Sequence, residues 1–218
     1  MADTLAFIGG TGPEGKGLAL RYARAGHPVV LGSRDAGRAA GVAGELNAAL
    51  GGGDLVSGAT NLDAAQRASI VFLTLPFDGQ SDALPPLAAA VTGKLVISTV
   101  VPLAFVGGRP SVLPVPQGSA AQQAAALLPG AKVAAAFHHL SAKHLADLGH
   151  AMEGDVLVCA TDAEAKQAAM QLVAEVPALR AIDAGGLENA VTVEAMTAVL
   201  LGINRRYKVS AAVRIVGV

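Results

Sequence analysis

Short apolar runs alternate with alanine-rich segments along the whole chain. The apolar runs have the length of β-strands and span residues 5–9, 28–32, 54–59, 70–75, 95–99, 132–137, 155–160 and 179–183. The segments between and after them have helical length and span residues 14–25, 35–50, 62–67, 80–91, 117–128, 162–176 and 187–204. This alternation predicts an α/β fold with a mostly parallel sheet that is covered by helices on both faces.

Glycine and proline interrupt the alternation at two places. Residues 51–53 are three consecutive glycines, which end the second helical segment, and residues 107–117 contain three prolines and predict an irregular loop. Neither place has the length or composition of a linker between independent domains. Because 52% of the residues are hydrophobic, the chain has enough apolar material for one large core.

The charge balance and the apolar runs exclude several kinds of partner. The formal net charge is -1 and the chain has no run of lysine or arginine, so no nucleic acid or anionic membrane is expected to bind. The longest apolar run, residues 95–106, is far shorter than the roughly 20 residues of a membrane span. The start of the chain lacks the pattern of a signal peptide, and the single cysteine, Cys159, allows no internal disulfide. We therefore expect a cytoplasmic protein.

The glycine-rich stretch GGTGPEGKG, residues 9–17, follows the first predicted strand and fits two phosphate-binding motifs. Gly10, Gly12 and Gly15 match the spacing G-x-G-x-x-G of a dinucleotide fingerprint. Counted from Gly10 to Gly15-Lys16, the same stretch nearly matches the G-x-x-x-x-G-K of a nucleoside-triphosphate loop. The triphosphate loop needs a serine or threonine after its lysine to coordinate magnesium, but Gly17 follows Lys16 here. The stretch therefore favours a dinucleotide over a triphosphate.

Each glycine of the fingerprint has a physical role. Gly10 allows the tight turn, Gly12 lets the backbone approach the pyrophosphate, and Gly15 lets the following helix pack on the sheet. The N-terminus of that helix supplies free amides and the positive end of the helix dipole. The residues predicted to hold the pyrophosphate are Gly10, Thr11, Gly12, Pro13, Glu14 and Gly15.

The end of the second predicted strand indicates which dinucleotide binds. An NAD site places an aspartate or glutamate there to hold the ribose 2′-hydroxyl, whereas this chain has Ser33 and Arg34. A guanidinium beside a hydroxyl suits a 2′-phosphate, and Arg38 and Thr11 could reach the same anion. The alternative is that both arginines are solvated residues in the first turn of a helix, where they would oppose its dipole. NADP(H) is the expected cofactor.

With these residues the chain resembles the family of NADPH-dependent coenzyme F420 reductases, also called F420H2:NADP oxidoreductases. It is also similar to the related reductase lobe of the STEAP ferric reductases. Beyond the first stretch, the resemblance is carried by LTLPFD at 73–78, STVVPL at 98–103, FHHLSA at 137–142, DVLVCATD at 155–162 and DAGGLENA at 183–190. Ser141 stands where relatives commonly have proline, and His139 stands where a small hydroxyl residue is usual.

The resemblance implies a Rossmann-like, doubly wound domain over residues 1–184 that binds NADP(H). It further implies a small C-terminal helical segment over residues 185–218, which covers the substrate pocket or the interface of a homodimer. By motif position the 2′-phosphate would be held by Thr11, Ser33, Arg34 and Arg38. The nicotinamide and deazaflavin rings would be lined by Pro76, Val100, Pro102 and His138, and Leu75, at the end of a predicted strand, is a further candidate to bind the cofactor. The implied reaction is direct hydride transfer between NADP(H) and coenzyme F420.

The chemistry of the predicted strand ends agrees with a hydride transfer between two stacked rings. The residues there are mostly apolar, and the sequence offers no nucleophile with an adjacent base and no pair of carboxylates. Two alternatives stay open. One is a reductase with a flavin or ferric acceptor in place of F420, and the other is a non-catalytic regulatory module that binds NADP(H).

Four histidines within a short span, His138, His139, His144 and His150, raise the question of a metal. Their spacing lacks a strong i, i+4 pair, and no carboxylate motif accompanies them, so no metal site is expected. His138 directly follows a predicted strand and could donate a hydrogen bond to either coenzyme. The alternative is that its ring bonds to nearby backbone.

Overall fold

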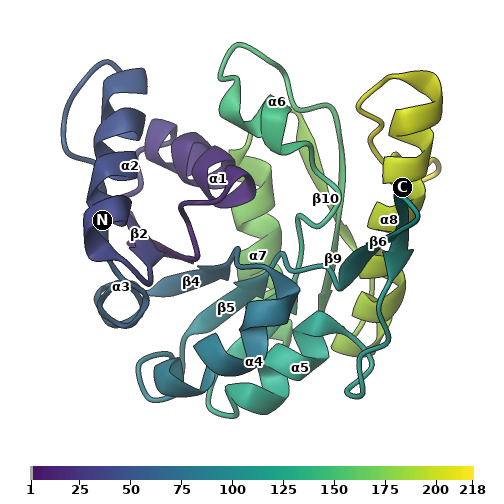
Figure 1. Cartoon of the computed structure of the whole chain (residues 1–218), viewed down its shortest axis with the longest axis horizontal. Helices are drawn as coiled ribbons and strands as arrows, with labels where there is room; N and C mark the ends of the chain where they lie inside the picture. Colours follow the sequence, from purple (N-terminus) through teal and green to yellow (C-terminus); the bar gives the residue numbers. More distant parts are fainter. Residues whose placement is uncertain (1) are drawn as a thin grey trace.

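The computed structural model, which describes residues 2–218, contains one sheet of eight strands (Figure 1). The strand order is β10-β9-β8-β5-β4-β1-β2-β3. The strands span Leu5–Ile8 (β1), Val29–Ser33 (β2), Val56–Thr60 (β3), Ile70–Leu73 (β4), Leu95–Ser98 (β5), Lys132–Ala135 (β8), Gly154–Ala160 (β9) and Leu179–Asp183 (β10). From β3 to β8 every neighbouring pair is parallel, which confirms the predicted mostly parallel sheet.

The chain reverses direction between β8 and β9. To pair in parallel with β8, the next strand would need a long crossover that carries the chain back to the end of the sheet where β8 begins. The segment between these strands contains only the short helix α6 (Ala142–Ala146), which lies near the carboxyl end of β8. As a result β9 pairs with β8 in antiparallel orientation, and β10 pairs in parallel with β9.

Helices cover both faces of the sheet, as predicted. They span Pro13–Arg24 (α1), Ala36–Ala49 (α2), Asn61–Arg67 (α3), Gln80–Ala83 (α4), Ala120–Leu127 (α5), Ala163–Glu175 (α7) and Ala190–Tyr207 (α8), with short 3-10 turns at Phe77–Gly79 (η1), Pro85–Leu87 (η2) and Leu187–Asn189 (η3). Successive residues of β1 point to opposite faces: Leu5 and Phe7 pack with α1, α2 and α7, and Ala6 and Ile8 pack with α3, α5 and α8. The side chains of β1 are therefore buried on both faces. None of the helices within residues 2–218 is long and apolar enough to cross a membrane.

Two expectations from the sequence were wrong. The helix expected over residues 80–91 is reduced to α4 and η2, because Pro85 and Pro86 lack the amide hydrogens that a helix interior needs. The irregular loop expected over residues 107–117 begins with the turn and the second strand of a hairpin, which pairs β6 (Leu103–Val106) with β7 (Arg109–Val112). Gly107 and Gly108 form its two-residue turn with φ values of 56° and 74°, the conformation that hairpin turns favour.

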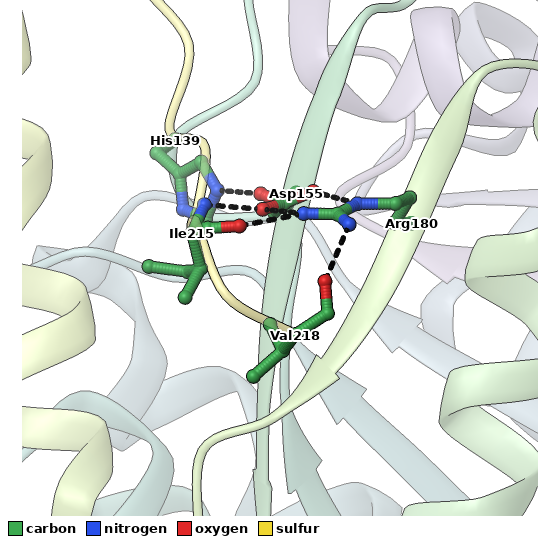
Figure 2. Close-up of polar contacts among 5 residues, drawn as sticks. All are labelled: His139, Asp155, Arg180, Ile215 and Val218. Carbon is green, nitrogen blue, oxygen red and sulfur yellow. Dashed lines mark hydrogen bonds and ion pairs between the residues drawn. The ribbon is translucent and has the colours of Figure 1, made fainter.

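The C-terminal tail, residues 208–218, has no helix or strand and is held by one polar network (Figure 2). Arg180 on β10 donates through Nε and Nη2 to the two carboxylate oxygens of Asp155 on β9, each at 2.7 Å. The same guanidinium donates to the backbone oxygens of Ile215 and Val218, and the amide of Ile215 donates to Asp155. The hydrogen bonds from Arg180 lower the pKa of Asp155 to about 2, so this fully buried carboxyl is ionised at neutral pH. The network fastens the tail to the antiparallel edge of the sheet.

Segment α8 and the tail also connect to the rest of the chain through the hydrophobic core. Leu187, Ala190 and Val193 are buried with strands β1, β4 and β5 in one cluster. The division of the chain at residue 184 stays a prediction.

Candidate active site

The glycine-rich loop crosses the carboxyl end of β1 and is held by the neighbouring strands. The amide of Gly10 lies 3.0 Å from the backbone oxygens of both Phe7 and Gly32. Asn61, which begins α3 directly after β3, accepts a hydrogen bond from the amide of Gly9 at 3.2 Å. Gly9 has a φ of 72°, so the left-handed residue of the turn is Gly9 and the turn begins one residue earlier than the motif spacing indicates.

The three motif glycines differ in what surrounds them. A Cβ on Gly10 would lie 2.7 Å from the oxygen of Phe7, and a Cβ on Gly15 would lie 2.6 Å from Cα of Gly10. Both positions exclude a side chain because backbone packs against them. For Gly12 the nearest atom to such a Cβ is the oxygen of Gly9, 3.7 Å away. Gly12 is therefore the position of the loop where the backbone is open to an approaching group.

The N-terminus of α1 has uncompensated hydrogen-bond donors. Gly12 is its N-cap and supplies no side-chain acceptor, and Pro13 stands at the first helical position. Within residues 2–218, the amides of Thr11, Glu14 and Gly15 have no acceptor. Free amides at the positive end of a helix of this length form a site for an anion.

The carboxyl end of β2 brings the predicted 2′-phosphate residues together. Ser33 is the last residue of β2 and is 8% exposed, and its Oγ accepts a hydrogen bond from the amide of Asp35 at 3.2 Å. Asp35 in turn caps α2 by accepting from the amide of Arg38. Arg34 and Arg38 are both exposed, and neither guanidinium forms an ion pair within the described part of the chain. Two cations and a hydroxyl hydrogen are thus available to an anion here.

The residues predicted to line the rings follow β4, β5 and β8, which are neighbours in the sheet. Leu75 is half-buried and Pro76 is exposed, and both follow β4. Val100 and Pro102 follow β5, and His138 follows β8; all three are buried. The sheet register therefore brings the predicted ring-lining residues to the same carboxyl edge as the glycine-rich loop.

The backbone before His138 is strained. Phe137, which is fully buried, has a φ of 68°, a left-handed conformation that a bulky residue rarely adopts. The backbone oxygen of His138 accepts a hydrogen bond from Oγ1 of Thr197 on α8 at 3.0 Å. These two features constrain the backbone at His138, and the hydrogen bond connects it to the C-terminal helix α8.

The His138 ring is buried, neutral and without a partner. Neither ring nitrogen has a hydrogen-bond partner within residues 2–218. Burial, with a smaller contribution from His139, lowers the pKa of His138 to about 3. The hydroxyl of Ser98, the last residue of β5, is also buried without a partner. Buried polar groups in folded proteins are nearly always hydrogen-bonded, so these atoms fit a site that a ligand completes.

The other three histidines have different surroundings from His138. Nε2 of His139 lies 2.7 Å from the backbone oxygen of Asp155. The rings of His144 and His150 are 3.8 Å apart between centroids and line a cavity of about 480 Å³ together with Ser210 of the tail. No group of three histidine, cysteine or acidic side chains within residues 2–218 is arranged to hold a metal ion.

Sequence reasoning missed Asn61 and Thr197, and it left open whether Glu194 faces the pocket mouth, a partner subunit or solvent. Asn61 holds the glycine-rich loop, Thr197 holds the backbone of His138, and Glu194 on α8 accepts hydrogen bonds from the amides of Ala120 and Ala121 at 2.8 and 2.9 Å. Burial raises the pKa of Glu194 to about 7, and these hydrogen bonds oppose the increase. Neither Asn61 nor Thr197 has a local signal in the sequence. The N-cap of α3 is Thr60 and not Asn61, and both contacts join residues more than 50 positions apart along the chain.

The chain is similar to known proteins over nearly its whole length. A family model described as "NADP oxidoreductase coenzyme F420-dependent" matches residues 4–102. The F420-dependent NADP reductase of Methanothermobacter thermautotrophicus is 40% identical, and the match covers 99% of this chain and 95% of that protein. The F420-dependent NADP reductase of Methanocaldococcus jannaschii is 37% identical over 94% of this chain and 93% of that protein. A crystal structure of a proposed F420-dependent NADP reductase from Arthrobacter sp. FB24 has a TM-score of 0.84 and 26% identity, covering 98% of this chain and 99% of that one.

Proposed function

This chain belongs to the family of coenzyme F420-dependent NADP oxidoreductases, and we propose on that basis that it transfers a hydride between NADP(H) and the deazaflavin coenzyme F420. The observation that carries the proposal is the arrangement at one edge of the sheet. An uncovered helix N-terminus lies there beside a group of apolar residues that includes the unpartnered, neutral ring of His138. The first suits a diphosphate, and the second suits planar ring systems.

The glycine-rich loop and the end of β2 would hold the two anionic parts of NADP(H). The free amides of Thr11, Glu14 and Gly15 would donate to the pyrophosphate, next to the open position at Gly12. The 2′-phosphate would lie at the end of β2. Its proposed partners are Thr11, Ser33, Arg34 and Arg38.

The ring-lining residues would orient the two rings and exclude water. When they are bound, one coenzyme supplies the hydride and the other accepts it. For direct transfer, the protein has to supply close positioning and a dry environment, which the buried residues Val100 and Pro102 favour. Because His138 is neutral at physiological pH, it would act as a hydrogen-bond partner and not as a charge. Leu75 and Pro76 would close the pocket on the side of β4.

The proposal is tested by turnover. Mixing the protein with NADPH and oxidised coenzyme F420 is expected to give rapid loss of the deazaflavin absorbance. Reactions with NADH in place of NADPH, and with FMN in place of F420, serve as matched comparisons and are expected to be much slower. Turnover of FMN without turnover of F420 would instead favour a flavin reductase. Tight NADPH binding with no turnover of either acceptor would contradict the proposed enzymatic activity and favour a regulatory module that binds NADP(H).

We further propose that two copies of the chain form a homodimer through α8 and the β6–β7 hairpin, which lie side by side (Figure 1). Phe105 and Val106 of the hairpin are 68% and 66% exposed, and Val199 and Tyr207 of α8 are 61% and 67% exposed. Exposed apolar side chains gathered in this way are typical of an interface. Analytical sedimentation of the wild type should give twice the mass of the chain. Val199→Glu should shift the protein toward the monomer. A wild-type protein that is monomeric at micromolar concentration would contradict the proposed dimer.

A cytoplasmic location is also part of the proposal. The single cysteine, Cys159, is buried and unpaired, which agrees with a reducing compartment. Fractionation of cells that produce the protein should recover it with cytoplasmic markers, and recovery with secreted proteins would contradict this.

A further inference from the structure

Glu14, in the first turn of α1, carries a carboxyl group with one buried oxygen that has no hydrogen-bond partner within residues 2–218. The residue as a whole is half-buried, and its Oε1 is inaccessible to solvent. No donor within residues 2–218 reaches this oxygen. An unsatisfied buried carboxyl is costly, and in folded proteins such groups usually have a functional explanation.

The position of Glu14 on α1 shows where its side chain lies. Residues three and seven positions further along a helix share its face, and here they are Gly17 and Arg21. A Cβ on Gly17 would lie 2.6 Å from Cβ of Leu145 on α6, and Nε of Arg21 donates to the backbone oxygen of Leu145 at 2.9 Å. Glu14 therefore lies at the N-terminal end of the face that packs toward α6. The segment that leads from His138 into α6 is on the same side, and the free amides of the loop are adjacent.

The charged groups on the surrounding elements do not compensate an ionised Glu14. Lys16 on the same helix pairs with Glu45 at 2.9 Å. Arg21 is occupied by backbone oxygens of the segment 144–150, and His138 is neutral. Lys143 on α6 is exposed. Burial alone raises the pKa of Glu14 to about 8. The protonated form of the side chain has a hydrogen to donate, and Oε1 has no partner within the described residues.

We infer that Glu14 acts as a neutral carboxylic acid that donates a hydrogen bond to an oxygen of the bound dinucleotide, so that binding takes up a proton whenever Glu14 is ionised. The inference rests on the proposed binding of NADP(H). It explains how an acidic residue can stand in a loop that receives a diphosphate, where an ionised carboxylate would repel the ligand. Glu14 is then a positioning residue for the dinucleotide.

The sign of the pH dependence follows from which form binds. The acid is protonated below about pH 8, so affinity is full there, and it falls by up to about tenfold per pH unit above that value. A 2′-phosphate titrates near pH 6, and the pKa values of His138, His139 and His144 are all lowered, so these groups change below the window. Glu194 titrates near pH 7 but contacts the N-terminus of α5. Between pH 7.5 and 9.5, the protonation of Glu14 should therefore determine how NADPH affinity changes with pH.

The experiment measures NADPH affinity by calorimetry from pH 7 to 9.5 for the wild type, Glu14→Gln and the control Glu164→Gln. Glu164 is an exposed glutamate on α7, and its replacement removes one acid at a distance from the loop. The wild type and the control should lose about thirtyfold in affinity over this range, as expected for one proton with a pKa near 8. Glu14→Gln should match the wild type at pH 7, because the amide also donates, and should vary less than about threefold with pH.

A second measurement needs no variant. Binding heats of the wild type at pH 8.5, in two buffers with different ionisation enthalpies, should show uptake of more than half a proton. Repeating this with 2′-phospho-ADP-ribose, which keeps the diphosphate but lacks the nicotinamide, assigns the acceptor oxygen. Uptake that persists assigns it to the phospho-ADP-ribose part of the dinucleotide, and uptake that disappears assigns it to the nicotinamide.

Three results would overturn the inference. They are a pH-independent wild-type affinity, the same slope in folded Glu14→Gln as in the wild type, and binding without proton uptake. In each of these cases NADPH still binds, so the proposed function would stand. Absence of NADPH binding at every pH would overturn both.

Discussion

Replacing Arg34 by alanine is expected to weaken NADPH binding by about 30- to 100-fold while leaving NADH affinity within about threefold of the wild type. Arg34 follows β2 beside Ser33, is exposed, and has no carboxylate partner in the described residues. A charge-assisted hydrogen bond to phosphate contributes about 1.5–3 kcal/mol, and tenfold in affinity corresponds to about 1.4 kcal/mol. NADH has no 2′-phosphate, so its affinity should not depend on this hydrogen bond. Fluorescence titration with both dinucleotides measures the difference.

One arginine variant and one lysine variant serve as controls for this prediction. Arg24 is exposed at the opposite end of α1, and Lys16 lies in the motif but pairs with Glu45 at 2.9 Å. Arg24→Ala and Lys16→Ala should each keep NADPH affinity within about threefold, because exposed ion pairs contribute little. Equal weakening of NADPH and NADH by Arg34→Ala would remove the 2′-phosphate argument. Hydrolysis of ATP by the wild type would contradict the dinucleotide interpretation of the loop.

The sheet could be predicted from sequence because its strands are buried on both faces. Strands such as β1 and β5 are continuous apolar runs, so each was found, with ends displaced by one or two residues. Helices were predicted well where an alanine-rich segment had no proline inside it. The broken segment after β4 shows the limit, since Pro85 and Pro86 were present in the sequence but the apolar content of 80–91 outweighed them. The β6–β7 hairpin was missed because the three prolines of 107–117 concealed the Gly107-Gly108 turn.

Short motifs could propose parts of the candidate site only where the residues are neighbours in sequence. The glycine-rich loop and the Ser33-Arg34 pair are local motifs, so their spacing is visible without a structure. Glu194 lies in an apolar stretch of α8 and could have been solvent-exposed; its burial beneath α5 depends on how α8 packs. Thr197 is similar, because its bond to His138 joins residues 59 positions apart. The unpaired state of Glu14 and His138 is a property of burial, which the sequence does not contain.

Gly15→Ala is expected to lower NADPH affinity by more than about 100-fold and to reduce the free energy of unfolding by about 1–3 kcal/mol. A Cβ at this position would lie 2.6 Å from Cα of Gly10 and 2.9 Å from its oxygen, and both are backbone atoms that cannot rotate away. The third contact, Oγ1 of Thr74 at 2.8 Å, is held by the backbone oxygen of Ile8. The start of α1 must therefore move away from the loop, which disperses the amides that face the pyrophosphate.

Two other glycine variants separate the loss of binding from the loss of stability. Gly12→Ala adds a methyl group whose nearest neighbour is 3.7 Å away, in a backbone conformation with φ of -77° that alanine adopts readily. It should unfold at the temperature of the wild type and still lose about 30-fold or more in NADPH affinity, because the methyl group occupies the space of the diphosphate. Gly44→Ala, in the exposed interior of α2 with no atom within 4 Å, should bind normally and gain about 0.5–1 kcal/mol. Thermal unfolding and titration of the three variants give the comparison. If Gly12→Ala binds NADPH as the wild type does, the diphosphate does not approach this loop, and the assignment of the glycine-rich loop as the diphosphate site is wrong.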